Sequence, residues 1–251
     1  MKDIYIGDTG KGFPLVLVHG FLGSSEMWKP QIEFFKSNYR VITPDLPGFG
    51  NSNNAQSCDS IKLMAQMMNN FLKEKRLENF FLLGHSMGGM IVQEMTKFLS
   101  DKITKLILYG TGPIGNIPGR FETIDQSREK LKKQGLKITS KEIAKTWFVK
   151  GDNSKYFDLC THAGNLTSLK AADDALIAMK NWNGLDNLKT IKNDTLIIWG
   201  DQDMAYKYDQ IKILSENIKN SNLKIFKGCS HNVHLEKPDE FNKCISEYFK
   251  D

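Results

Sequence analysis

The sequence predicts an α/β fold in which a largely parallel sheet is covered by helices on both faces. In the first third and the last quarter of the chain, short apolar segments alternate with stretches of helical periodicity. In addition, a Gly-His-Ser-Met-Gly segment follows one apolar segment directly and precedes an apolar helical pattern. The 251 residues are enough for one large domain with a substantial buried core.

The first expected strands are residues 4–6 and 15–18, two apolar segments joined by a glycine-rich turn over residues 7–12. Residues 27–37 have the pattern of a helix, and residues 40–43 that of the next strand. This strand, helix, strand order favours parallel pairing, because a crossover helix returns the chain to the same edge of the sheet.

Apolar residues recur at helical spacing over residues 61–72 and predict a second helix there. Its methionines, Met64 and Met68, are expected to fill the core and not to bind a ligand. A strand over residues 80–83 and a helix over residues 90–99 follow.

Later strands are expected at residues 105–109, 195–199 and 223–226. The long interval between the first two of them carries three helical patterns, around residues 121–134, 140–149 and 169–181, and no convincing strand. We therefore expect a helical cap inserted into the core. The predicted boundaries are residues 1–112 and 194–251 for the core and residues 113–193 for the cap.

Residues 84–88, Gly-His-Ser-Met-Gly, place Ser86 on the turn between an expected strand and an expected helix. Such a turn holds its central residue in a strained conformation that lifts the side chain clear of the sheet edge. Small residues two positions away, here Gly84 and Gly88, let the backbones approach closely. The sequence therefore predicts a nucleophile elbow with Ser86 as the nucleophile.

A serine hydroxyl needs a base to take its proton. His231 lies just beyond the expected strand at residues 223–226, where a loop at the carboxyl edge of the sheet would bring it over Ser86. His234 is the alternative base. It lies nearer to the expected start of the last helix, so a capping or packing role is favoured for it.

The base in turn needs an acid to orient it, and two carboxylates follow the expected strand at residues 195–199. Asp203 is the predicted acid because it is far enough past the strand end to turn back toward the imidazole. Asp201 is expected to bond the amides of the turn. The resulting chain order is serine, aspartate, histidine.

Acyl transfer also requires amide donors for the developing oxyanion. The first is expected to be the backbone N–H of Met87, and the second that of Phe21, in the loop after residues 15–18, with Leu22 as the alternative. Structural roles are expected for the other histidines, His19, His85 and His162.

Several separated motifs occur in this order: residues 19–23 (His-Gly-Phe-Leu-Gly), 45–50 (Asp-Leu-Pro-Gly-Phe-Gly), 84–89 (Gly-His-Ser-Met-Gly-Gly), 200–203 (Gly-Asp-Gln-Asp) and 228–231 (Gly-Cys-Ser-His). On these motifs the chain resembles the α/β-hydrolase superfamily from its first strand to its last helix. The resemblance implies a predominantly parallel eight-stranded sheet, a helical cap after the sixth strand, and no metal or organic cofactor. Ser86 disfavours dehalogenase and epoxide hydrolase chemistry, since those relatives carry an aspartate at that position.

Within the superfamily, the resemblance to carboxylesterases is the best, because a histidine before the serine, here His85, is common among them. Carbon–carbon bond hydrolases of aromatic ring-cleavage products usually have asparagine there. Residues 20–24 and Trp28 also resemble the synthase that eliminates pyruvate in menaquinone biosynthesis. Met90, however, stands where that branch often has an arginine.

Residues 45–50 also resemble the methyl esterase that acts on a carrier-bound pimeloyl chain. Such an enzyme would need a basic face on its cap for the acidic carrier protein. Arg120 and Arg128 could contribute to it, although a role in surface solubility is favoured for both.

Composition excludes several other functions. The net charge of +5 comes mainly from dispersed lysines, which disfavours nucleic-acid binding. The four cysteines have no spacing typical of zinc or redox motifs and suggest reduced thiols in a cytoplasm. No apolar signal core or membrane-spanning segment is visible, so a soluble cytoplasmic protein is expected.

The predicted function is hydrolysis of a small or medium carboxylic ester by a serine esterase. The expected pocket is apolar. Leu22 and Val233 are its favoured lining residues because they lie close in sequence to the site, and Trp147, Phe148 and Trp182 are further candidates. A ligand-sensing protein with slow turnover is the alternative of another class. The sequence predicts no oligomeric state.

Overall fold

The computed structural model describes residues 4–250 and contains, within them, a seven-stranded sheet. The strand order is β1-β3-β2-β4-β5-β6-β7. Only β1 runs antiparallel to its neighbour, β3, and the other strands pair in parallel. The strands are β1 (Ile6–Thr9), β2 (Phe13–Val18), β3 (Tyr39–Pro44), β4 (Phe80–His85), β5 (Ile103–Tyr109), β6 (Asp194–Gly200) and β7 (Ser221–Phe226).

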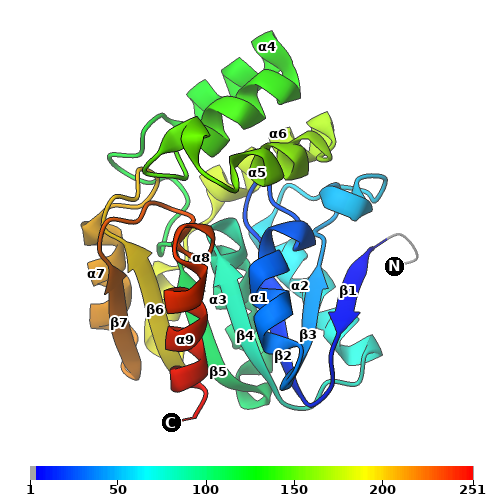
Figure 1. Cartoon of the computed structure of the whole chain (residues 1–251), viewed down its shortest axis with the longest axis vertical. Helices are drawn as coiled ribbons and strands as arrows, with labels where there is room; N and C mark the ends of the chain where they lie inside the picture. The colour runs from blue at the N-terminus through cyan, green and yellow to red at the C-terminus, as the bar shows by residue number, and fades with distance from the viewer. Residues whose placement is uncertain (1–3, 251) are drawn as a thin grey trace.

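Helices cover both faces of this sheet (Figure 1). They are α1 (Lys29–Phe35), α2 (Ile61–Glu74), α3 (Met87–Leu99), α4 (Ile124–Lys145), α5 (Phe157–Asn165), α6 (Leu169–Asn181), α7 (Tyr208–Asn217), α8 (Val233–Glu236) and α9 (Pro238–Tyr248). Short 3₁₀ turns lie at Ser25–Trp28, Gly50–Ser52, Ser100–Lys102, Gly151–Asn153 and Leu185–Thr190.

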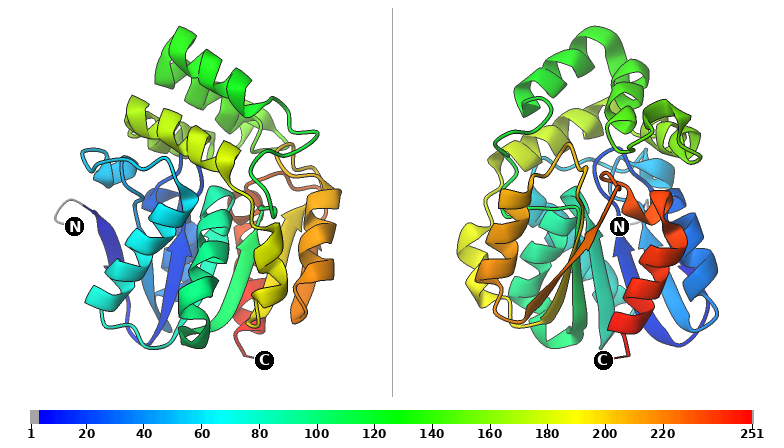
Figure 2. Two further views of the ribbon diagram at one scale, coloured as in Figure 1. Left: turned by 180° about the vertical axis from the view of Figure 1, so that it is seen from behind. Right: turned by 60° about the vertical axis from the view of Figure 1, so that its left-hand side comes forward.

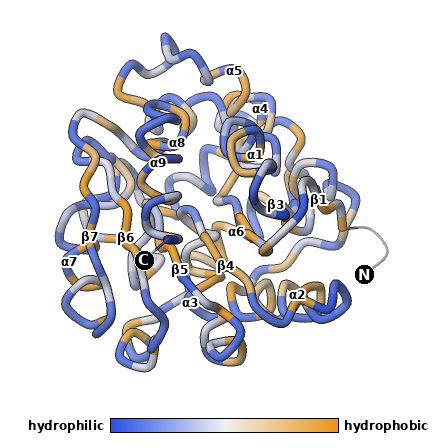
Figure 3. Tube along the Cα trace, turned by 60° about the horizontal axis from the view of Figure 1, so that its bottom comes forward, coloured by the Kyte–Doolittle hydropathy of each residue, from blue (hydrophilic) through white to orange (hydrophobic). Residues whose placement is uncertain are grey.

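The core consists of two apolar clusters, one on each face of the sheet. Side chains alternate along β2, so that Leu15 and Leu17 join one cluster while Val16 and Val18 join the other. Helices α1 and α9 cover the first cluster, in front of the sheet in Figure 1, and α2, α3 and α7 cover the second (Figure 2). Apolar residues accordingly concentrate along the central strands in Figure 3.

Helices α4, α5 and α6 lie between β5 and β6 in sequence, and in Figure 1 they lie above one edge of the sheet. We call residues 113–193 the helical segment. Its two ends are joined at the base, because the Gly115 N–H donates to the Trp182 carbonyl (3.1 Å) and the Gly184 N–H donates to the Pro113 carbonyl (2.8 Å). The segment therefore leaves and re-enters the sheet domain through one narrow connection.

Several element boundaries differ from the sequence-based expectations. The first strand begins at Ile6 and continues to Thr9, through part of the expected turn, because its backbone pairs with β3. Helix α4 joins two of the expected helical patterns across a kink at Gly135, where φ is 78°. Helix α5 was not expected at all.

Of the eight strands that the resemblance implied, seven are present in residues 4–250, and the helical segment follows the fifth of these seven. The eighth strand and the placement of the cap after a sixth strand are thus not confirmed. The division into a core and a cap at residues 113 and 193 stays a prediction.

In the part of the chain that the structure describes, every helix is too short or too polar to span a bilayer.

The contact between α3 and β2 at Gly88 allows a test of this packing. A Cβ atom at Gly88 would overlap the backbone carbonyls of Val18 and His19. We expect Gly88→Ala to lower the free energy of unfolding by about 1–3 kcal/mol, the usual cost of overpacking. Chemical denaturation measures it. Phe98→Ala, a truncation on the exposed side of the same helix, is the control. Equal midpoints for Gly88→Ala and the wild type would show that the two backbones are not in contact.

Candidate active site

Ser86 lies on the turn between β4 and α3 in a strained conformation, with φ 56° and ψ −120°. Two hydrogen bonds hold its backbone. The Ser86 N–H donates to the Tyr109 carbonyl (2.9 Å), and the Thr111 hydroxyl donates to the Ser86 carbonyl (2.8 Å). The Ser86 side chain does not cap α3 and is 9% exposed. The hydroxyl is thus available to a ligand.

The loop after β2 passes directly over this serine because residue 20 is a glycine. A Cβ atom at Gly20 would lie 2.8 Å from the Cβ and 3.4 Å from the Oγ of Ser86. No side chain fits at position 20 without moving one of the two loops. The Phe21 backbone is therefore brought close to Ser86.

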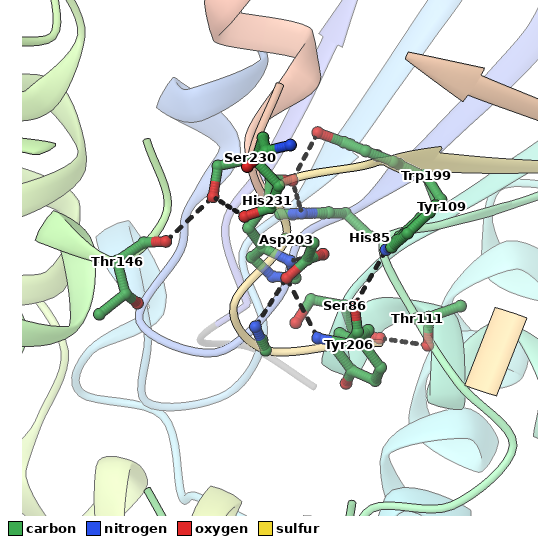
Figure 4. Close-up of polar contacts among 12 residues, drawn as sticks. His85, Ser86, Tyr109, Thr111, Thr146, Trp199, Asp203, Tyr206, Ser230 and His231 are labelled. Carbon is green, nitrogen blue, oxygen red and sulfur yellow. Dashed lines mark hydrogen bonds and ion pairs between the residues drawn. The ribbon is translucent and has the colours of Figure 1, made fainter. Parts of the chain in front are cut away.

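His231 and Asp203 form a buried pair next to the serine (Figure 4). Asp203 follows β6 and His231 follows β7, and the His231 Nδ1 lies 2.8 Å from the Asp203 Oδ2. The other carboxylate oxygen, Oδ1, accepts hydrogen bonds from the amides of Ala205 (2.7 Å) and Tyr206 (3.1 Å). Both oxygens of Asp203 are engaged, so the carboxylate has one fixed orientation toward the imidazole.

Ser86 and His231 line the same cavity of about 30 Å³, room for one or two water molecules. Tyr206 stacks on the imidazole of His231, with ring centroids 5.7 Å apart and an interplanar angle of 13°. Most of the remaining lining is apolar. It comprises Phe21, Gly115, Ile117, Arg120, Phe121, Ile124, Ile143, Trp147, Met179 and Ala205. An ester must therefore displace part of this wall on binding.

The competing candidates, His234 and Asp201, lie elsewhere. The His234 Nδ1 is 2.9 Å from the Tyr109 hydroxyl, and its ring packs against Trp28, with centroids 4.7 Å apart. Burial lowers the pKa of His234 to about 3. Asp201 accepts a hydrogen bond from the Gly228 amide (2.7 Å), as a turn residue would. Neither side chain lines the cavity.

His85 lies behind His231. Its ring stacks on that of Tyr109, with centroids 4.4 Å apart, and its Nε2 is 3.2 Å from the His231 carbonyl. Burial lowers the pKa of His85 well below its usual value, so the ring is neutral and Nε2–H donates to this carbonyl. The Tyr109 hydroxyl also contacts the same carbonyl, at 2.8 Å. His85 and Tyr109 thereby hold the backbone of His231.

His19 joins two loops near the site. Its Nδ1 is 2.8 Å from the Gly20 carbonyl, and its Nε2 accepts a hydrogen bond from the Leu46 amide (2.9 Å). Burial lowers the pKa of His19, in keeping with a neutral ring that donates through one nitrogen and accepts through the other. His162, in contrast, is exposed on α5.

The two amides expected as oxyanion donors border the site. Phe21 lines the cavity, and Met87 is the first residue of α3, where the helix dipole is positive. Within residues 4–250 neither amide donates a hydrogen bond to another part of the protein. The alternative donor, Leu22, has φ 53° and a buried side chain.

The predicted pocket residues differ in their placement. Trp147 lines the cavity, whereas Leu22 and Val233 do not. Val233 begins α8, which turns its side chain into the apolar cluster on the α1 and α9 face of the sheet. Of the other two candidates, Phe148 is outside the lining as well, and Trp182 donates its indole N–H to Glu94 (2.9 Å). Nearness in sequence to a predicted site residue was therefore a poor guide to the pocket.

Tyr206 was not predicted from the sequence as a site residue, and a role in surface solubility was favoured for Arg120. Tyr206 lies three residues after Asp203 in the same loop, and this spacing was the available signal. Burial raises the pKa of Tyr206. Hydrogen bonding of its phenol to the side chains of Ser86 and Thr111 partly opposes this shift, and the phenol stays protonated. Arg120 lies in the connection between β5 and α4, and its neighbours Ile117 and Phe121 also line the cavity.

Fold and site together define a class: hydrolases built on an open α/β sheet, which carry the nucleophile on the turn after a central strand. Comparison with known proteins supports the same class. The family model described as the alpha/beta hydrolase fold matches residues 14–134. The chain belongs to the α/β-hydrolase superfamily.

Full-length similarities support this assignment. The chain is 27% identical to a putative non-heme chloroperoxidase from Synechocystis, over 99% of this chain and 95% of that protein. It is also 27% identical to a pimeloyl-[acyl-carrier protein] methyl ester esterase from Legionella pneumophila, over 99% and 100% of the two chains. The structure of an esterase from Exiguobacterium antarcticum superposes with a TM-score of 0.88, at 26% identity and 99% and 96% coverage.

Residues 4–250 contain no group of three or more histidine, cysteine or acidic side chains arranged to hold a metal ion.

The buried histidines lead to a prediction about pH. An exposed histidine in the unfolded chain titrates near 6.5, whereas burial lowers the pKa of His234 to about 3. Between these values the unfolded chain binds a proton that the folded protein does not, so the free energy of unfolding falls as the pH falls. His234→Gln should make this decline shallower by up to about 1.4 kcal/mol per pH unit.

Urea denaturation at pH 7, 6 and 5 measures the effect, and His162→Gln, at an exposed histidine, is the matched control. Equal slopes for His234→Gln and the wild type would contradict the buried, neutral state of His234.

Proposed function

We propose that this protein is a serine hydrolase that cleaves carboxylic esters through an acyl-enzyme on Ser86. The observation that carries the proposal is the 2.8 Å contact between His231 Nδ1 and Asp203 Oδ2, with His231 and Ser86 lining one cavity. A buried imidazole that is oriented by a carboxylate and lines the same cavity as a serine is the arrangement used for general-base activation of an alcohol.

The histidine tautomer follows from this contact. An ionised carboxylate can only accept hydrogen bonds, so Nδ1 of His231 carries the proton that points at Asp203. Nε2 then has a free lone pair. In the first step, Nε2 takes the proton from the Ser86 hydroxyl while Oγ attacks the ester carbonyl, and Asp203 stabilises the resulting imidazolium.

The tetrahedral intermediate places a negative charge on the former carbonyl oxygen. The amides of Phe21 and Met87 are the proposed donors for it, since both border the site and neither bonds to another group in residues 4–250. The dipole of α3 adds positive potential at Met87.

Collapse of the intermediate breaks the bond to the alcohol, which leaves with the proton held on His231. The acyl group is now attached to Ser86. A water molecule attacks this ester, and its proton passes to His231 and then back to the serine as the carboxylic acid is released. One ester and one water thus give one acid and one alcohol.

Ser86→Ala tests the nucleophile. We expect kcat for p-nitrophenyl butyrate to fall by about 10⁵- to 10⁶-fold, because removal of a triad serine leaves only binding and oxyanion stabilisation. Steady-state kinetics measures it. Ser215→Ala on α7, which is outside the cavity, is the control. If Ser86→Ala keeps activity within tenfold of the wild type, Ser86 is not the nucleophile.

Asp203→Asn tests the orienting acid. An amide at this position can stabilise the wrong imidazole tautomer, so kcat should fall by roughly 10⁴-fold, as in other enzymes with this triad. Asp201→Asn, two residues away on the turn, is the matched control and should retain most of the activity. Comparable losses in the two variants would remove Asp203 from the mechanism.

A further inference from the structure

Arg120 is the one cationic side chain among the residues that line the cavity with Ser86 and His231. It also lines a surface hollow of about 270 Å³ formed by residues 116–120 and 122–124. Its guanidinium therefore lies at the boundary between the enclosed site and the outside. A ligand that extends from Ser86 toward the hollow would pass this group.

The hydrogen bonds of Arg120 leave one edge of the guanidinium without a protein acceptor. Nη1 donates to the Glu122 carbonyl (3.2 Å) and to the Ser127 hydroxyl (3.3 Å). Within residues 4–250, Nε and Nη2 donate to no protein atom, and Arg120 forms no ion pair. The nearby Glu122 carboxylate pairs instead with Lys130 (2.6 Å).

Two other arginines show what this edge does elsewhere in the same protein. Arg40 binds the Asp8 carboxylate through Nε (2.8 Å) and Nη2 (2.7 Å). Arg128 binds Asp173 through Nε (2.6 Å) and Nη2 (3.1 Å). This two-point contact is the usual geometry of arginine with a carboxylate. In the part of the chain that the structure describes, Arg120 differs from both in having no carboxylate on that edge.

The partly buried position of the Arg120 guanidinium is energetically unfavourable for a cation. Burial lowers the pKa of Arg120, yet an arginine remains protonated throughout the ordinary pH range. A partly buried cation with no carboxylate in direct contact is unfavourable, and an anion bound at its free edge would offset that cost. The ring of Phe121, whose centroid is 4.7 Å from the guanidinium carbon, fixes the group from one side.

We infer that Arg120 binds a carboxylate of the substrate, and that the preferred esters carry a second, ionised carboxyl group, as half-esters of dicarboxylic acids do. The inference rests on the proposed function. The ester carbonyl would lie at Ser86, and the free carboxylate would meet the Nε and Nη2 edge of Arg120 at the mouth of the site.

A basic face on the cap for an acidic carrier protein is disfavoured. That face would have used Arg128 together with Arg120, but Arg128 is paired with Asp173. A single unpaired guanidinium that lines the cavity suits a small anionic group on the substrate better than it suits a protein surface.

The first test compares kcat/KM for monomethyl adipate with kcat/KM for methyl heptanoate, a neutral ester of similar length. The wild type should prefer the half-ester, and Arg120→Gln should lower the ratio of the two values by about 10- to 100-fold, as expected for loss of hydrogen bonds to a charged group. Arg120→Lys, which keeps the charge but cannot make the two-point contact through Nε and Nη2, should give an intermediate ratio. Arg128→Gln is the matched control and should leave the ratio unchanged.

The second test measures binding without turnover. Calorimetry of the Ser86→Ala variant should show that monomethyl adipate binds about 10- to 100-fold more weakly once Arg120→Gln is added. Circular dichroism confirms that each variant is folded.

The results separate the two proposals. Equal ratios in the wild type and Arg120→Gln, with binding unaffected in the second test, would overturn the carboxylate site even if Ser86-dependent ester hydrolysis is found. Arg120-dependent binding of the half-ester by a protein that hydrolyses no ester would support the carboxylate site and overturn the proposed function.

Discussion

The site depends on the close backbone approach at the start of α3. Gly88 lies against the carbonyls of Val18 and His19, and Gly20 lies against Ser86, so neither position has room for a side chain. This contact, together with the hydrogen bonds that join the Ser86 backbone to Tyr109 and Thr111, holds the serine at φ 56°. The same geometry brings the Phe21 loop beside the first turn of α3. The position of the hydroxyl and of the two proposed amide donors is thus set by one packing constraint.

The parallel sheet supplies the partners of the serine. Strands β4, β5, β6 and β7 are neighbours in that order, and their carboxyl ends meet at one edge. Loops that follow β6 and β7 therefore converge above β4, although Ser86 and His231 are far apart in sequence. Behind the pair, neutral His85 and the Tyr109 hydroxyl hold the His231 carbonyl. The imidazole is thereby fixed from its backbone as well as from Asp203.

Much of this could be predicted because it follows from local pattern and order. Glycines flanking Ser86 indicate the turn, and a parallel sheet places every strand-following loop at one edge, so the neighbourhood of Asp203 and His231 follows from their positions after strands. The walls of the cavity could not be predicted this way. Arg120 and Tyr206 reach it, while Leu22 and Val233 do not, because the outcome depends on how the helical segment folds back and on the direction in which α8 begins. The eighth strand was implied by resemblance alone and is not confirmed.

Trapping the acyl-enzyme would test the central claim most directly. The wild type would be mixed with p-nitrophenyl butyrate, quenched in acid within milliseconds, and analysed by intact mass and peptide mapping. The mechanism predicts one butyryl group per chain, attached to Ser86 and lost at the rate of turnover. Turnover without an acylated chain, or with the acyl group on another residue, would contradict a covalent mechanism at Ser86.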